Sequence, residues 1–251
     1  MKPQLLRFGN SQSPVVVIDE FSGNSEAIAA LADALAPFPP IKGNFFPGVR
    51  RVITEADAEA FNYLYEACRA AAPFIGGAFD VQGFGLSEGS FSIVAVRPDE
   101  LVPVQRTPHF DSPEQNILAM LHYLRVPPGS GTAFYRHRAT GIERVTPANV
   151  NRFVPIANGE AKKLPADSGY MHGSDDFYEQ IGAVEALPDR MVIYHGSLLH
   201  SGVIPPDMPF TSDPQRFPVC SPPWTKRNDT KWCSRCRRWC RELKRVTSSL
   251  S

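Results

Sequence analysis

The first 215 residues contain a single cysteine, Cys68, so disulfide bonds cannot hold this part of the chain together. No run of 18 apolar residues, long enough to cross a bilayer, occurs anywhere in the sequence. The N-terminal residues lack the sustained apolar core of a secretory signal peptide. These absences predict a soluble protein of a reducing compartment, the cytoplasm, with no membrane partner.

The chain also lacks net charge, but its charges are unevenly distributed. Its 26 basic and 26 acidic side chains balance, yet residues 216–251 carry ten of the basic ones and only two of the acidic ones. Residues 1–215 therefore form a mildly acidic body, and the basic character belongs to the last segment alone.

What the sequence does contain favours a strand-rich fold with many turns. The 43% hydrophobic content is enough for a sizeable core, and 24 prolines and 18 glycines suit short strands better than a helical bundle. A short strand pattern leads into two helical patterns, at residues 22–38 and 54–75, and a run of strand patterns follows from about residue 80. This order predicts an α+β protein whose core is an antiparallel double-stranded barrel or jelly roll.

We divide the chain into three regions. Residues 1–78 form an N-terminal strand and helical support region, residues 79–215 form the core, and residues 216–251 form a basic, cysteine-rich tail. A helix is predicted near residues 175–187. Strand patterns cover residues 13–21, 79–96, 116–126, 131–140 and 190–203.

The tripeptide His109-Phe110-Asp111 lies just before the apolar pattern at residues 116–126. On an extended segment, residues two apart point to the same side, so His109 and Asp111 would offer a nitrogen and an oxygen ligand to one cavity. A second histidine from a distant strand would complete a set of two histidines and one carboxylate, which leaves open positions on Fe(II). Taken alone, the tripeptide is equally compatible with a polar turn in which Asp111 caps the next element.

Two histidines in the stretch YHGSLLHSG could supply the third ligand. His195 closes a strand pattern, and His200 follows one short segment later, directly before a Ser-Gly pair. We predict His200 as the ligand and His195 as a residue that packs against or supports the site.

Three stretches carry a family resemblance over about residues 80–205: PHFDSP, LAMLHYLRVPPGSGTAF with its Tyr123-Leu124 pair, and DRMVIYHGSLLHSG. Their order resembles the 2-oxoglutarate- and Fe(II)-dependent dioxygenase superfamily, especially its prolyl-hydroxylase-like branch. The opening VVVIDEFSGNSEAI and the stretch FFPGVR are similar to a bacterial group of the same superfamily.

The resemblance implies a double-stranded β-helix core of the jelly-roll or cupin-like type, with Fe(II) held by His109, Asp111 and His200. It also implies 2-oxoglutarate as co-substrate and O₂ as oxidant. Such an enzyme would oxidise a C–H bond, usually by hydroxylation, of a small-molecule or peptide substrate that the sequence does not identify.

The distal carboxylate of 2-oxoglutarate needs a cation, because a buried carboxylate must be paired. The family pattern has Lys or Arg about ten residues after the distal histidine, where this chain has Phe210. Arg216 is the nearest candidate, and Arg136 and Arg138 at a strand end could bind the same carboxylate or an anionic substrate. The alternative for the latter two is a solvated strand end. Tyr123 could line the cavity, or it could belong to the aromatic core.

Four further residues have weaker assignments. Arg50 and Arg51 follow the FFPG turn and could close over the site, although only the neighbouring glycine turn supports this. His122 and His172 are interpreted as ordinary structural or surface residues.

The tail presents a separate problem. Its four cysteines nominally offer thiolates for zinc, but their spacing is not that of two compact ligand pairs. Its tryptophans and cations could grip a nucleic-acid strand, although we expect no nucleic-acid partner. Because the segment shows no strand alternation and its composition changes abruptly, we interpret it as a frameshifted or otherwise atypical C-terminus. Such a tail would be poorly ordered and would leave the enzyme impaired.

Two alternatives to the oxygenase remain open. One is a non-catalytic jelly-roll protein that binds a small molecule, which the absence of a cation at the family's spacing favours. The other is a cupin-like metalloenzyme that does not use 2-oxoglutarate.

Overall fold

The computed structural model describes residues 1–40, 46–214, 220–221 and 223–227. The N-terminal region holds β1 (Lys2–Phe8), β2 (Ser13–Asp19), α1 (Ser25–Ala34), β3 (Gly48–Val52) and α2 (Ala58–Phe79). The strands that follow are β4 (Phe84–Val94), β5 (Ile117–Tyr123), β6 (Gly131–His137), β7 (Tyr178–Glu185), β8 (Arg190–His195), β9 (His200–Val203), β10 (Cys220–Ser221) and β11 (Pro223–Arg227). The helix α3 (Val150–Ala161) lies between β6 and β7, and two short 3₁₀ turns (Pro98–Glu100 and Pro103–Arg106) precede β5.

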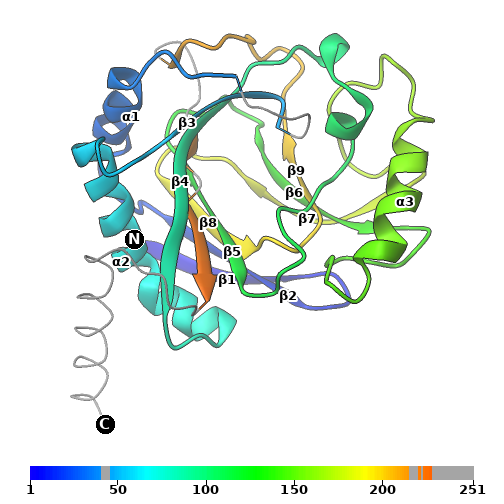
Figure 1. Cartoon of the computed structure of the whole chain (residues 1–251), viewed down its shortest axis with the longest axis horizontal. Helices are drawn as coiled ribbons and strands as arrows, with labels where there is room; N and C mark the ends of the chain where they lie inside the picture. Colours follow the sequence, from blue (N-terminus) through cyan, green and yellow to red (C-terminus); the bar gives the residue numbers. More distant parts are fainter. Residues whose placement is uncertain (41–45, 215–219, 222, 228–251) are drawn as a thin grey trace.

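The strands of the described residues form two antiparallel sheets, as the strand patterns predict (Figure 1). The larger sheet begins with the strand order β1, β2, β8, β5. The short strands β10 and β11 each lie between β5 and β4 and pair with both of them. Strand β3 pairs with the other edge of β4. The smaller sheet has the order β7, β6, β9. All pairings in both sheets are antiparallel, so the fold is a mixed α and β structure built on antiparallel sheets.

The helix α2 covers the outer face of the larger sheet. Its apolar stripe recurs every three or four residues and packs against Ile18, Met120 and Ile193 of three neighbouring strands. The buried residues of the stripe are Leu64, Ala67, Cys68, Ala71, Ile75 and Phe79. The helix predicted at residues 54–75 is present, but it begins later than expected. Asp57 is its N-terminal cap residue, and the Asp57 carboxylate accepts hydrogen bonds from the backbone N–H and the hydroxyl of Thr54.

The helix α3 covers the outer face of the smaller sheet, on the opposite side of the molecule from α1 and α2 (Figure 1). Its Phe153 packs with Tyr135, Tyr178 and Leu199 of that sheet. Between the two sheets, Val17, Phe134 and Tyr194 belong to a third apolar cluster that joins their inner faces. The two sheets therefore form two facing layers, each covered outside by helix.

The prediction of a helix near residues 175–187 is wrong, because residues 178–185 form strand β7. The strand is stabilised by antiparallel pairing with all of β6, a long-range interaction that local composition does not reveal. Asp175 starts it by accepting hydrogen bonds from the backbone N–H groups of Phe177 and Tyr178. The helix α3 and the edge strand β1 have no counterpart among the predicted elements.

The tail was expected to supply no strand, yet β10 and β11 both lie between β4 and β5 of the larger sheet. Arg216 and the cysteines at 233, 236 and 240 lie outside the described residues. The interpretation of residues 216–251 as an atypical C-terminus stays a prediction. Among the helices of the described residues, none is long and apolar enough to span a membrane.

Candidate metal centre

The three predicted metal ligands meet at one end of the smaller sheet. His109 forms a single antiparallel bridge with His200, in which each backbone N–H donates to the other's carbonyl oxygen at 2.8 Å. The backbone N–H of Asp111 donates to the carbonyl oxygen of Gly196 at 2.7 Å. These three backbone hydrogen bonds fix the histidine-aspartate segment against the start of β9, so ligands that are distant in sequence face one another.

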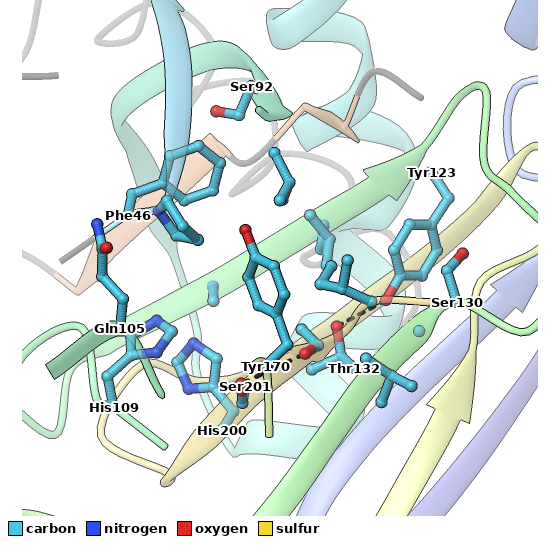
Figure 2. Close-up of a pocket in the computed structure, with 18 of the residues that line it drawn as sticks. Phe46, Ser92, Gln105, His109, Tyr123, Ser130, Thr132, Tyr170, His200 and Ser201 are labelled. Carbon is cyan, nitrogen blue, oxygen red and sulfur yellow. Dashed lines mark hydrogen bonds between the residues drawn. The ribbon is translucent and has the colours of Figure 1, made fainter. Parts of the chain in front are cut away.

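The side chains of the three residues converge on one point. One ligand atom from each of His109, Asp111 and His200 lies within 4.8 Å of the others. The Asp111 Oδ1 atom is 3.5 Å from His200 Nε2 and 3.8 Å from His109 Nε2. Figure 2 shows the two imidazole rings turned toward the same space, with their centroids 4.3 Å apart.

The surroundings of the second carboxylate oxygen of Asp111 indicate that a cation can bind at this point. Asp111 Oδ2 is buried and accepts no hydrogen bond from any described residue. Buried carboxylate oxygens in folded proteins nearly always have a partner, and a metal ion is one such partner. The donor set of two imidazole nitrogens and one carboxylate suits Fe(II) and leaves further coordination positions open.

The protonation of the two histidines differs. Enclosure by the pocket walls, and then the charge of His200, lowers the pKa of His109 to about 4, which leaves a neutral imidazole able to bind a metal. Burial also acts to lower the pKa of His200, but the Asp111 carboxylate and the Leu198 carbonyl outweigh it and raise the pKa. The Nδ1–H of His200 donates to the Leu198 carbonyl at 2.8 Å, which directs Nε2 toward Asp111.

The three residues open into a cavity of about 190 Å³ between the two sheets. Its wall is mostly apolar and includes Phe46, Val94, Ile204 and Met208. Tyr123 lines this cavity and also belongs to the apolar cluster between the sheets, and its hydroxyl hydrogen-bonds to the Thr132 hydroxyl at 2.7 Å (Figure 2). The cavity therefore places a pair of hydroxyl groups and the histidine-aspartate cluster around one apolar space.

Arg136 and Arg138 do not reach this cavity, so the structure does not support the prediction that they bind the co-substrate. Arg136 forms ion pairs with Glu143 and Glu179, each at 3.3 Å, and Arg138 donates to the backbone carbonyl of Asp175 at 2.9 Å. The residues of β6 that line the cavity are Gly131 and Thr132 at its start, whereas Arg136 lies near the end of the strand and Arg138 lies beyond it.

Arg50 lines the cavity, whereas the neighbouring Arg51 does not. Arg50 and Arg51 are consecutive residues of β3 and so point to opposite faces. Arg51 instead forms an ion pair with Asp57 at 2.7 Å. In the sequence, only the preceding FFPG turn indicated that an arginine could reach the site. That signal did not show which of the two arginines faces the cavity.

Three other histidines that the sequence analysis considered lie away from the cavity. His195 packs edge-on against Phe79 at 5.1 Å, on the helix-covered side of the larger sheet. His122 is fully buried between Tyr63 and Asp189, with contacts of 2.8 and 3.0 Å. His172 is exposed. None of the three lies in the cavity.

Comparison with known families assigns the chain to one of them. The model of DUF6445, described as a family of unknown function, matches residues 1–216, and the chain belongs to this family. Among curated proteins, none matches.

Solved structures of similar fold include two enzymes that are described as non-haem and α-ketoglutarate-dependent. The carbocyclase SnoK from nogalamycin biosynthesis has a TM-score of 0.51 at 12% identity, covering 87% of this chain and 81% of its own. HygX from Streptomyces hygroscopicus, with nickel and 2-oxoglutarate bound, has a TM-score of 0.50 at 14% identity, covering 89% and 87%. The epimerase SnoN, also from nogalamycin biosynthesis, has a TM-score of 0.50 at 11% identity, covering 86% and 79%. At these identities the similarity shows the fold alone, and the fold of this chain is similar to the folds of these three proteins.

Proposed function

We propose that the protein is an Fe(II)- and 2-oxoglutarate-dependent oxygenase that hydroxylates a small-molecule or peptide substrate. The observation that carries the proposal is the meeting of His109, Asp111 and His200 on the wall of one largely apolar cavity. We interpret the two sheets as the halves of a double-stranded β-helix, with the metal centre at the end of the smaller one. The ligands bound in HygX, nickel and 2-oxoglutarate, support this choice of metal site and co-substrate.

The residues of the chain have distinct parts in this proposal. His109 and His200 would each supply one imidazole nitrogen to the metal, and Asp111 would supply a negative charge that partly balances a divalent cation. The apolar wall would exclude water from the reacting groups, and Fe(II) held by these three residues would supply the activation of O₂. Overall, one C–H bond of the substrate becomes C–OH while 2-oxoglutarate and O₂ yield succinate and CO₂.

The test is Fe(II)-dependent release of succinate from 2-oxoglutarate by the full chain. We expect release by the wild type and none by His109→Ala or Asp111→Ala, because each variant lacks one ligand. The matched control is His172→Ala, which removes an exposed histidine away from the cavity and should retain activity. Equal succinate release by the wild type and both ligand variants would contradict the assignment of the triad.

Metal analysis separates the alternatives. Iron bound by the anaerobically reconstituted protein without any succinate release would favour a cupin-like enzyme that uses another co-substrate. Small-molecule binding without bound iron would favour the non-catalytic jelly-roll protein.

A further inference from the structure

The cavity contains one arginine and no lysine among the described residues that line it, and this arginine is Arg50. No described carboxylate lies within ion-pair distance of its guanidinium group; the contacts it makes are to Ser92 and Phe46. Burial lowers the pKa of Arg50, although Glu88 and Asp111 act in the opposite direction. A guanidinium held in a mostly apolar cavity is costly unless an anion accompanies it.

Strand register places Arg50 in a row that crosses the larger sheet. Arg50 is the partner of Ser92, Ser92 is the partner of Cys220, and Cys220 is the partner of Tyr123. Directly paired residues project from the same face of a sheet, and Arg50, Ser92 and Tyr123 all line the cavity. Three strand spacings of roughly 4.8 Å put the Cα atoms of Arg50 and Tyr123 about 14 Å apart, with the cavity above them.

The arginine is oriented within this row. Its Nε–H donates to the Ser92 hydroxyl at 2.9 Å, and its guanidinium carbon lies 4.8 Å from the centre of the Phe46 ring. This contact occupies one of the five N–H donors of the group, and the terminal nitrogens keep the fork that binds a carboxylate through two parallel hydrogen bonds. In Figure 2, Ser92 and Phe46 lie on the cavity wall above the two histidines.

Arg50 is also electrostatically linked to the metal centre. Arg50, His109, Asp111 and His200 all line the same cavity, whose wall is mostly apolar and screens charge less than water does. A ligand bound at the histidine-aspartate cluster therefore lies within the field of this arginine. A second negative group on such a ligand would complement the unpaired guanidinium.

We propose that Arg50, oriented by Ser92 and Phe46, binds the distal carboxylate of 2-oxoglutarate. The co-substrate is then anchored from β3, a strand that precedes the core, and the site does not depend on a cation ten residues beyond His200. This inference rests on the proposed function, because it assumes that 2-oxoglutarate is the co-substrate. A carboxylate on the primary substrate has the same chemistry, so the experiment must distinguish the two sources.

The experiment measures binding in the absence of turnover. The full chain is loaded with Mn(II) without oxygen, and calorimetry gives the Kd of 2-oxoglutarate and of 2-oxopentanoate, which lacks the distal carboxylate. For Arg50→Gln, we expect the Kd of 2-oxoglutarate to rise roughly 10- to 100-fold, the range for a hydrogen-bonded charge pair. The Kd of 2-oxopentanoate should not change. Arg50→Lys should fall between wild type and Arg50→Gln, because it keeps the charge but not the fork.

Two controls bracket the result. Arg51→Gln changes the adjacent arginine of the same strand, which does not line the cavity, and should leave both Kd values unchanged. Arg216→Gln tests the candidate that the family spacing favoured and should also leave both unchanged. Melting temperatures of all variants verify that each one is folded.

The outcomes separate the inference from the proposed function. If Arg50→Gln binds 2-oxoglutarate as tightly as the wild type, the inference is wrong, and a substrate-borne carboxylate at Arg50 would give this result. An equal loss for both oxo acids also overturns it, because the effect would not depend on the distal carboxylate. If the wild type binds neither Mn(II) nor 2-oxoglutarate, the proposed function itself fails.

Discussion

A divalent metal ion should stabilise the folded protein measurably, because the three ligands meet only after folding. His109 and Asp111 are joined to His200 by backbone hydrogen bonds between the histidine-aspartate segment and the start of β9, and the unfolded chain has no such arrangement. A ligand that binds only the folded state at 100 times its Kd adds about 2.7 kcal/mol to the free energy of unfolding. In a chain of this length, each kcal/mol shifts the melting temperature by about 2–4 °C. We therefore expect a rise of roughly 5–10 °C with Mn(II).

The assay is a thermal melt of the full chain with EDTA and with increasing Mn(II). His200→Ala should remove the shift, because it deletes one of the three ligands and leaves two donors for the metal. The same substitution also removes the hydrogen bond to the Leu198 carbonyl, so its melting temperature in EDTA is measured separately. His172→Ala should keep the full shift.

The shift must depend on the triad for the reasoning to hold. A shift of equal size in wild type and His200→Ala would mean that Mn(II) binds elsewhere on the folded protein. The absence of any shift in the wild type, at concentrations where calorimetry detects binding, would mean that the metal binds folded and unfolded chains alike. Either result refutes the metal centre as described.

Three further substitutions test how the scaffold supports the site. Arg136→Gln should lower the free energy of unfolding by about 1–3 kcal/mol, because it leaves the buried Glu143 without its ion pair, and should leave the Kd of 2-oxoglutarate unchanged in calorimetry. Gly131→Ala should cost about 1–3 kcal/mol in chemical denaturation, because its Cβ would lie 2.4 Å from a backbone carbonyl oxygen of β7. Asp189→Asn should destabilise at pH 7, since hydrogen bonds from His122 and residues 22–23 outweigh burial and hold the pKa of Asp189 well below its usual value. A carboxyl with a lowered pKa loses its stabilising effect as the pH falls, so the difference from wild type should narrow below about pH 4 in denaturant titrations.

The convergence of His109, Asp111 and His200 could be predicted from the sequence because the signals for it are local and ordered. Two ligands lie two residues apart before a strand, and the third begins another strand next to a Ser-Gly pair. The choice of His200 over His195 agrees with the structure, where His200 faces Asp111 and His195 packs on Phe79. The resemblance to a known superfamily added the order of these signals along the chain.

The carboxylate-binding residue could not be found in the same way. Arg50 enters the cavity because β3 pairs with β4, and that pairing joins two segments separated by the whole of α2. No local pattern distinguishes Arg50 from Arg51, since the choice depends on which face of β3 is turned inward. Arg136 was predicted to bind a carboxylate because it belongs to a basic cluster, but it forms an ion pair with Glu143, which lies in the loop after β6. Long-range strand pairing therefore decided the position of Arg50, whereas Arg136 is paired with a glutamate that is close to it in the sequence.

The interpretation of residues 216–251 as an atypical C-terminus can be tested by shortening the chain. Its composition indicates an atypical tail, whereas β10 and β11 fill the space between β4 and β5 and hydrogen-bond on both sides. A chain ending at residue 214 would expose the unpaired edges of both neighbouring strands, and one ending at residue 227 would retain the two strands.

We expect the shorter chain to lose several kcal/mol, because each lost backbone hydrogen bond contributes roughly 0.5–1.5 kcal/mol and the total stability of a domain is about 5–15 kcal/mol. Exposed strand edges also favour aggregation, so the shorter chain should form oligomers in size-exclusion chromatography. The chain ending at residue 227 is the matched control and should stay monodisperse under the same conditions as the full chain. Equal melting temperatures for the two shortened chains would show that residues 215–227 contribute nothing to the sheet, and the interpretation as an atypical tail would then stand.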